Sequence, residues 1–464
     1  MMVVVEIKDK RTIFLFVGII VALLIWNLKL PGLSLAGRKM FSLTLMTVIF
    51  WAAKVADSAY IAALFLMLML IFEIAPPEEV LSLWTSQTVY LVIGAYLIAA
   101  AVERSGLGER IAYKFIIRFV DSYRSIIYSI FALTFLMSLI IPHPWPRAFI
   151  IMSVMSVVIE NAGINKNDAS KIGLTVFAAS IPISMIFLTG ESTLNFMTLE
   201  FAGVDLSWGG WFLYMGAPAA LAATLTLVVI LKLFKPEEEV EINKKKIGQK
   251  LLDLGMMSAE EQRTVFWLIA AVVLWMTDSF HGVELGWLTL TIAVMMSLPL
   301  TGDVLKKEDW NQVPIKVLIF LTAAVAIGKV GSLTGMNQWL AEVVLPAEAP
   351  GNMLYFALMT AGLSMFLHMF LGSVIAVMGI AIPAFIIFAE SFGINPLVPA
   401  LFVYTAIGTH YILPFHHLNI LVGMGKENGN YREKDVIKLG IPLTAVALIT
   451  IVFEYFWWQF TGLI

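Results

Sequence analysis

Long apolar runs separated by short charged segments dominate the chain. A helix that crosses a bilayer needs roughly 20 predominantly apolar residues. The longer apolar runs are residues 12–28, 80–102, 125–141, 172–190, 206–231, 285–300 and 439–464. Shorter runs, which reach across a membrane if their polar flanks lie at the interfaces, are residues 40–53, 58–72, 264–277 and 317–328. The pattern predicts an all-α integral membrane protein.

One stretch of the second half is almost free of charge. Residues 349–425 carry Glu390 as their only formally charged side chain. This stretch must hold three apolar segments, with breaks near Gly372 and near residues 393–396. A water-exposed loop system needs more charge than this, so we expect the whole stretch to lie in the membrane.

Basic residues mark the segments that we expect on the cytoplasmic side of the membrane. Lysine and arginine gather in residues 103–124, 235–263 and 426–438. The first two segments lie on the same side only if residues 125–160 enter the membrane and return. The centre of that segment reads Pro142-His143-Pro144-Trp145-Pro146-Arg147, and prolines interrupt a helix. We therefore expect a re-entrant hairpin at 125–160 and a cytoplasmic N-terminus.

The chain also repeats itself. Residues 92–112 resemble residues 320–341, and each copy is a Gly/Ala-rich helix that runs through a Ser-Gly or Thr-Gly turn into an amphipathic segment. The opposite charge bias of the two amphipathic segments indicates an inverted-topology repeat, which is typical of secondary transporters. We expect about 11 transmembrane helices plus two re-entrant hairpins. The expected parts are repeat one (1–235) with hairpin 125–160 and broken helix 172–196, a cytoplasmic linker (236–263), and repeat two (264–464) with hairpin 353–390 and broken helix 399–423.

Composition excludes several classes of protein. Apolar residues make up 60% of the chain and charged residues 14%, against about 45–50% and about 25% in soluble proteins. The absence of cysteine excludes disulfides, Cys-ligated zinc and thiol catalysis. A net charge of −3 gives no reason to expect nucleic-acid binding. Because no small-residue cleavage site follows the N-terminal charges, we expect a retained first helix and a multi-pass protein of the inner (cytoplasmic) membrane.

Several short motifs are informative, namely residues 94–112, Asp309-Trp310, residues 379–383, and Leu413-Pro414 with Asn419. Together they resemble the divalent anion:sodium symporter family of the ion transporter superfamily. The resemblance implies a homodimer in which each protomer has a scaffold and a transport domain that moves as an elevator. It also implies di- or tricarboxylate or sulfate substrates, usually driven by sodium.

The departures from the family pattern lie at the hairpin tips and helix breaks. The family has Ser-Asn-Thr at both tips, whereas the tips here read Pro142-His143-Pro144 and Ser373-Val374-Ile375. The family's Thr-Pro-Pro-Asn turns become residues 191–195 and 416–419. Sodium and protons are therefore equal candidates for the coupling ion, and we expect no other cofactor.

Polar residues at these breaks are the candidate site. A guanidinium matches the oxygens of an anion, and Glu191 in a charge-poor helix is suited to carry a proton or bind sodium. The predicted substrate-binding residues are His143, Trp145, Arg147, Ser192, Thr193, Asn195, Ser373, His416, His417 and Asn419. The predicted cation-coupling residues are Glu191, Ser138, Gly190, His368 and Gly372. The alternative is that these side chains satisfy one another between helices, or that Arg147 extends to the interface.

The function expected from these features is secondary active transport of a small anion, which is not an enzymatic activity. Dicarboxylate, sulfate, sulfonate and other oxyanions all fit one arginine and several imidazoles. An exchanger or efflux carrier of the same superfamily is the main alternative. A transition-metal carrier or intramembrane metalloenzyme is a further one, because His143, His416, His417 and Glu191 could supply nitrogen and oxygen ligands. The direction of transport stays open.

Overall fold

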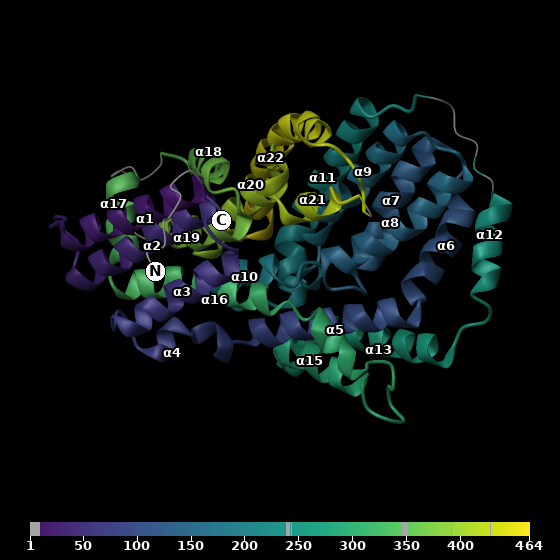
Figure 1. Cartoon of the computed structure of the whole chain (residues 1–464), viewed down its shortest axis with the longest axis horizontal. Coiled ribbons are helices and arrows are strands. Elements are labelled where there is room, and N and C mark those ends of the chain that lie inside the picture. Colours follow the sequence, from purple (N-terminus) through teal and green to yellow (C-terminus); the bar gives the residue numbers. More distant parts are fainter. Residues whose placement is uncertain (1–9, 238–241, 243, 346–350, 391, 427) are drawn as a thin grey trace, which may run out of the picture. The chain divides into compact units, whose positions relative to one another are not determined.

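The computed structural model describes residues 10–237, 242, 244–345, 351–390, 392–426 and 428–464. The expected cytoplasmic N-terminus (1–9) and parts of the expected linker lie outside the described residues. All regular elements of the described part are helices (Figure 1). The chain forms two compact units, and each is made of three separate segments of the sequence.

Unit 1 comprises Met1–Val89, Met197–Val204 and Pro314–Tyr404. Its helices are α1 (Lys10–Asn27), α2 (Leu35–Ala52), α3 (Ser58–Ile71), α4 (Pro77–Val80), η1 (Ser82–Thr85), α16 (Ile315–Leu333), α17 (Met336–Val344), α18 (Met353–Leu371) and α19 (Val374–Glu390). Most of α10 (Leu194–Ala202) and of α20 (Leu397–Thr409) also belongs to it.

Unit 2 comprises Tyr90–Phe196, Asp205–Val313 and Thr405–Ile464. Its helices are α5 (Gln87–Ser105), α6 (Leu107–Phe119), α7 (Tyr123–Ser138), α8 (Pro144–Asn161), α9 (Lys166–Ser184), η2 (Leu188–Gly190), α11 (Trp208–Leu233), α12 (Lys244–Asp253), α13 (Ala259–Met276), α14 (Asp278–His281), α15 (Leu285–Met295), η3 (Lys307–Gln312), η4 (Pro414–His416), α21 (Leu418–Gly423) and α22 (Glu433–Thr461). The start of α5 belongs to unit 1. These units are compact groups of helices drawn from separate segments, whereas the expected repeats, 1–235 and 264–464, are continuous stretches of sequence. The division into repeats therefore stays a prediction.

The predicted helices are largely present. Within the described residues, six helices are long and apolar enough to cross a membrane, namely α1, α5, α11, α16, α18 and α22, and five shorter apolar helices accompany them. The predicted run 80–102 begins later as a helix, at Gln87, because residues 77–85 form the short helices α4 and η1. The run 285–300 ends earlier, at Met295, where the chain turns.

The two segments that resemble each other in sequence, residues 92–112 and 320–341, have similar turns. Gly106 follows α5 and begins α6 with a φ of 74°, and Gly335 does the same between α16 and α17 with a φ of 78°. A positive φ is strained for most residues but not for glycine. The Ser-Gly and Thr-Gly turns of the sequence are therefore the points at which both long helices end.

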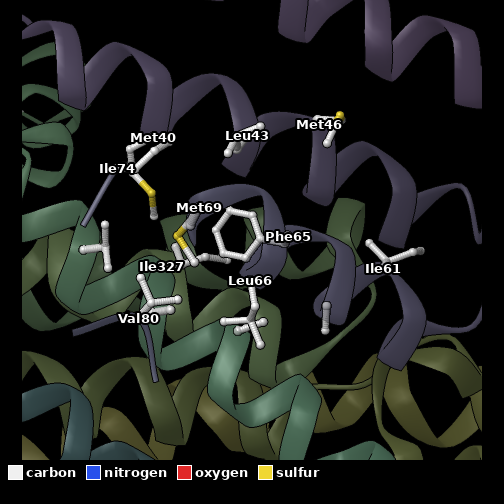
Figure 2. Close-up of a cluster of buried hydrophobic side chains, with 14 of the residues drawn as sticks. Met40, Leu43, Met46, Ile61, Phe65, Leu66, Met69, Ile74, Val80 and Ile327 are labelled. Atoms are coloured by element: carbon white, nitrogen blue, oxygen red, sulfur yellow. The ribbon is translucent and has the colours of Figure 1, made fainter. Parts of the chain in front are cut away.

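Unit 1 is held together by a cluster of apolar side chains. Met40, Leu43, Phe65, Met69 and Ile327 come from α2, α3 and α16 and lie against one another (Figure 2). The opposite face of α1 exposes apolar side chains, with Ile20, Leu23 and Leu24 more than half exposed. Exposed apolar faces on helices whose backbone bonds are internally satisfied suit contact with lipid.

Two ion pairs, one of them buried, hold the expected cytoplasmic ends of unit 2. Arg104 donates to Asp309 from Nη2 at 2.6 Å, which joins the end of α5 to η3. Arg110 donates to Glu261 from Nε at 2.5 Å and to the carbonyl of Gly255 at 2.9 Å, which joins α6 to the start of α13. Asp309, one of the motif residues of the sequence, therefore acts as an anchor for α5.

The Arg110–Glu261 pair makes stability depend on pH. Burial raises the pKa of Glu261, but the hydrogen bonds from Arg110 and the backbone of Ser258 outweigh burial and hold the pKa below its ordinary value. A lowered folded-state pKa gives stability above the ordinary pKa, and this stability is lost as the pH falls through the folded value. We expect Glu261→Gln to lower the free energy of unfolding by on the order of 2 kcal/mol at neutral pH, and by less in acid. Thermal unfolding at several pH values tests this, and equal destabilisation at every pH would contradict it.

Candidate functional site

The loop between α7 and α8 forms the first half of the site. α7 ends at Ser138, whose hydroxyl donates to the carbonyl of Phe135 at 2.7 Å. Pro142 lies in the loop, His143 precedes the first turn of α8, and Pro144 is in that turn. Proline has no N–H and cannot continue α7, but it is well suited to a first helical turn. The proline run therefore ends one helix and begins the next, as a hairpin tip requires.

The second half is the break between α9 and α10. α9 contains Pro182 and ends at Ser184, several residues before the predicted break at Gly190. The backbone carbonyls at and beyond the end of α9 accept hydrogen bonds from side chains. The Nδ2 group of Asn195 donates to the carbonyls of Ser184, Phe187 and Leu188 at 3.1, 3.0 and 3.1 Å. Trp211 of α11 donates to the carbonyl of Met185 at 2.9 Å. The break is thus a fixed structure and not a loose loop.

Arg147 joins the hairpin tip to the break. Its side chain is fully buried. Nη1 donates to the carbonyl of Ile141 in the tip at 3.0 Å and to the carbonyl of Gly190 in the break at 3.1 Å. Nη2 donates to the hydroxyl of Ser184 at 2.5 Å. Three oxygens from two segments therefore surround one permanent positive charge.

His143 and Glu191 face each other at the same junction. His143 Nδ1 lies 3.6 Å from Glu191 Oε1, and His143 Nε2 lies 2.7 Å from the hydroxyl of Tyr96 on α5. Trp145, half-buried, meets the imidazole ring edge-on at 5.3 Å between ring centroids. Glu191 Oε1 also accepts from the N–H of Thr193 at 3.0 Å. Histidine, carboxylate and tyrosine hydroxyl form one buried polar cluster.

Three buried donors at this junction have no hydrogen-bond partner among the described residues. They are the hydroxyls of Ser192 and Thr193 and the Nε of Arg147. The N–H of Ser192 donates to the carbonyl of Pro142 at 3.1 Å, which places these hydroxyls beside the hairpin tip. Burying a donor without a partner costs on the order of 1–3 kcal/mol. Such donors in one place are typical of a site that receives an acceptor-rich ligand.

The third segment of the site is the break between α20 and α21. His416 Nδ1 accepts from the N–H groups of Ile412 and Leu413 at 3.2 and 3.3 Å, and His417 Nδ1 accepts from the N–H of Asn419 at 3.3 Å. Both histidines are buried, and the rings of His410 and His416 lie 6.3 Å apart. The imidazoles thus hold the backbone of the break with one nitrogen each.

A chain of polar groups on α9 connects the breaks of unit 2. Asn419 Nδ2 donates to the hydroxyl of Ser180 at 3.0 Å. Ser184 donates to the carbonyl of Ser180 and accepts from Arg147. The connected residues therefore run from the hairpin tip through α9 to α21. Sequence reasoning missed Ser180, Ser184 and Tyr96, because uncharged residues in a helical run carry no local signal; only the packing of α9 identifies them.

The remaining predicted residues belong to unit 1. Gly372 ends α18 with a φ of 58°, and the hydroxyl of Ser373 accepts from the N–H of Ala376 at 3.4 Å. His368 is fully buried in α18. The loop between α18 and α19 is therefore a second hairpin tip in its own unit. The part of these three residues in binding stays a prediction.

The arrangement does not favour a metal centre. Within the described ranges, no group of three or more histidine, aspartate or glutamate side chains is placed to hold a metal ion. His143, Glu191, His416 and His417 each bond a neighbouring protein group through one nitrogen or oxygen.

The sequence is similar to those of known membrane proteins. Residues 9–464 match the family model described as the sodium:sulfate symporter transmembrane region. A membrane protein of Cupriavidus necator is 25% identical, covering 97% of this chain and 92% of the relative. The putative malate transporter YflS of Bacillus subtilis is 26% identical over 71% of each chain. Dicarboxylate transporter 2.1 of Arabidopsis thaliana chloroplasts is 25% identical, covering 82% of this chain and 70% of the relative.

A solved structure is also similar. The YdaH transporter of Alcanivorax borkumensis has a TM-score of 0.49 and 14% identity, covering 80% of this chain and 85% of that one. The family match covers nearly the whole chain, and it confirms the resemblance seen in the sequence motifs and the expectation of a multi-pass membrane transporter. The chain belongs to the sodium:sulfate symporter family of membrane transporters.

Proposed function

We propose that the protein is a secondary active carrier of a small dianion, with a dicarboxylate as the first substrate to test. The observation that carries the proposal is the set of buried donors without partners, the hydroxyls of Ser192 and Thr193 and the Nε of Arg147. These donors lie at the junction of the hairpin tip and the break, beside the start of α10, where the partial positive charge of a helix favours an anion. The printed names of the malate and dicarboxylate relatives support the choice of substrate class.

Removing the two hydroxyls tests the binding site. We expect the double variant Ser192→Ala/Thr193→Val to bind malate or succinate about tenfold more weakly, because two hydrogen bonds of about 0.5–1.5 kcal/mol each are lost. The measurement is the dicarboxylate-dependent rise of the unfolding temperature, with sulfate and chloride as comparison anions. Thr224→Val is the matched control, because the Thr224 hydroxyl is exposed on α11 and bonds only to its own helix. An unchanged affinity in the double variant would contradict the assignment.

The geometry of Arg147 also supports a proposal about the coupling ion. In transporters with broken helices, unwound carbonyls and helix C-terminal ends coordinate sodium. Here the carbonyls of Ile141 and Gly190 and the hydroxyl of Ser184 accept from the Arg147 guanidinium. The Arg147 guanidinium, a cation tethered to the chain, occupies the place among these three oxygens that a sodium ion would need. We therefore expect that transport does not require a sodium ion at this half of the site. Transport is then driven by protons or by exchange against a second anion.

Exchange is a distinct candidate within this proposal. A carrier with a permanent cation in its binding site returns most easily when the site is loaded with an anion. Counterflow and net uptake in proteoliposomes separate the two cases. Exchange alone gives fast counterflow and no net accumulation under a pH gradient. Proton symport gives fast counterflow and also net accumulation under a pH gradient.

Three further features are proposals that the family resemblance and the charge pattern support. They are a homodimer, an elevator-type movement, and insertion in the cytoplasmic membrane with the N-terminus inside. Light scattering of the detergent-solubilised protein tests the first, and a particle with the mass of one protomer would contradict it.

A further inference from the structure

A carboxyl group lies deep in unit 2, away from both helix breaks. Glu454 is the only formally charged residue between residues 439 and 464. It belongs to α22 and its side chain is fully buried. It lies 16 residues after Lys438, which is about 24 Å along an α-helix, whereas the apolar core of a bilayer is about 30 Å thick. Glu454 is therefore within the membrane.

The partners of Glu454 are few. Its Oε1 accepts from the hydroxyl of Thr405 at 2.5 Å. Its Oε2 has no hydrogen-bond partner in the part of the chain that the structure describes. Ionised groups inside a membrane are costly and usually pair with one another or face a cavity. A single hydroxyl does not compensate a carboxylate.

Among the described residues, the helices packed against α22 bring no lysine or arginine to this carboxyl. α11 lies alongside α22 (Figure 1), and Trp458 donates to the carbonyl of Tyr214 at 2.9 Å, one turn after Glu454. Lys438 lies 3.5 Å from the carbonyl of Leu233 at the other end of the pair. The described titratable groups on α22 and on the segments packed against it are Lys166, Asp168 and Lys171 (α9), Tyr404 (α20), His410 and Tyr411 (the break after α20), Tyr214 and Lys232 (α11), His416 (η4), and Glu433, Lys434, Asp435, Lys438 and Tyr455 (α22).

The cations of that set lie at the end of the helix pair away from Glu454. Lys232 is next to Leu233, which lies beside Lys438. Lys171 donates to the carbonyl of Lys235 at the same end, at 3.0 Å. The described polar partner of the Glu454 carboxyl is thus the Thr405 hydroxyl, and the ligand that such a carboxyl can take is a proton on Oε2.

Polar groups lead from Glu454 toward the break between α20 and α21. Thr405 donates to Glu454, and Thr409, one turn further along α20, donates to the carbonyl of Thr405 at 2.7 Å. α20 ends at Thr409, and the buried His410 and His416 follow in the break. Residues four apart lie on one face of a helix. One face of α20 therefore carries hydroxyls from Glu454 to the histidines.

We propose that Glu454 and Thr405 form a proton-binding site of the transport cycle, loaded on one side of the membrane and emptied on the other. The proton joins the Oε2 of the carboxylate from water and leaves to water, with no other bond changed. Loading makes the carboxyl neutral and lets α22 remain in the apolar core; unloading favours a state in which the carboxylate meets water. The inference rests on the proposed anion carrier and adds its coupling site.

Glu454→Gln separates proton coupling from anion binding, because glutamine has the shape of the protonated acid and cannot release a proton. We expect the variant in proteoliposomes to retain dicarboxylate counterflow within about twofold of the parent, and to lose uptake driven by a pH gradient by about tenfold or more. Its uptake no longer changes with pH, and substrate addition no longer moves protons, as followed with a pH-sensitive dye inside the vesicles. Glu390→Gln is the control, because Glu390 is an exposed carboxyl at the end of α19.

The outcomes that overturn the proposal are distinct. If the Glu454→Gln variant shows gradient-driven uptake and proton movement at the rates of the parent, Glu454 is a permanently neutral structural group and the proposal is wrong. Loss of counterflow together with uptake, at an unchanged unfolding temperature, also overturns it, because the site would then belong to anion movement itself. If Glu454→Gln does not fold, Thr405→Val provides the same comparison, with a shifted pH profile expected and an unchanged profile contradicting the proposal. A parent that carries no dicarboxylate in counterflow instead refutes the proposed function.

Discussion

Arg147→Ser is expected to abolish anion transport and to make the stability of the protein respond to sodium. The substitution removes the donors of two buried carbonyls and one hydroxyl, those of Ile141, Gly190 and Ser184. It also leaves Glu191 at this junction without its buried cation. Breaking a buried charge arrangement by removing one partner costs about 3–5 kcal/mol. We expect the free energy of unfolding to fall by that amount and counterflow to fall by roughly a hundredfold or more.

Sodium is the sharper part of the same experiment. In the Arg147→Ser variant the three oxygens no longer surround a guanidinium. A small cation can then take the place of the guanidinium and bind these oxygens. We expect sodium chloride to raise the unfolding temperature of the variant, relative to choline chloride, and to leave the parent unchanged. Arg118→Ser is the control, because Arg118 is exposed on α6. Stabilisation of the parent by sodium, or none in the variant, would contradict the tethered-cation interpretation.

The second large effect is expected at Asn195. Its Nδ2 group donates to the carbonyls of Ser184, Phe187 and Leu188, and together these bonds fix the end of α9. Asn195→Asp keeps the shape but replaces the donor with an oxygen that faces three carbonyl oxygens. Each buried carbonyl that loses its donor costs about 1–3 kcal/mol. We expect the free energy of unfolding to fall by about 3–5 kcal/mol and dicarboxylate binding to be lost, as measured by thermal unfolding with and without malate.

A matched substitution separates this effect from the chemistry of the amide. Asn352→Asp makes the same change at an exposed residue that caps α18 through its side-chain oxygen, and aspartate caps helices as well as asparagine does. The stability of this variant should match that of the parent. An Asn195→Asp protein as stable as the parent would mean that the break does not depend on the amide, and that Asn195 serves the substrate directly.

The sequence was sufficient for most of the helices, because helices depend on local patterns, whereas the binding roles of the candidate site residues stay predictions. Apolar length located the helices, and the proline run at Pro142 and Pro144 located the hairpin tip. The Gly106 and Gly335 turns marked the same point in both copies of the repeat. Candidate residues from hairpin 125–160 and from both broken helices do lie in one unit and are connected there.

The partners of these residues could not be predicted, because they depend on how distant helices pack. Tyr96 comes from α5, and Ser180 and Ser184 are ordinary serines in a helix until α9 lies against the tip and against Asn419. The first break contains Glu191 and Thr193 as predicted, but it begins earlier than the sequence indicated, because α9 ends at Ser184 just after Pro182. Asn195 then donates to the carbonyls that follow. Glu454 was passed over because a single carboxyl in a final helix has no local motif.

The central claim is that this member of the family carries a small anion with an arginine in place of a sodium ion at the first hairpin. The most direct measurement is the initial rate of dicarboxylate counterflow in proteoliposomes when all sodium is replaced by choline. We predict saturable counterflow whose rate changes by less than about twofold. A fall of about tenfold or more without sodium, or the absence of saturable flux in either medium, would contradict the account.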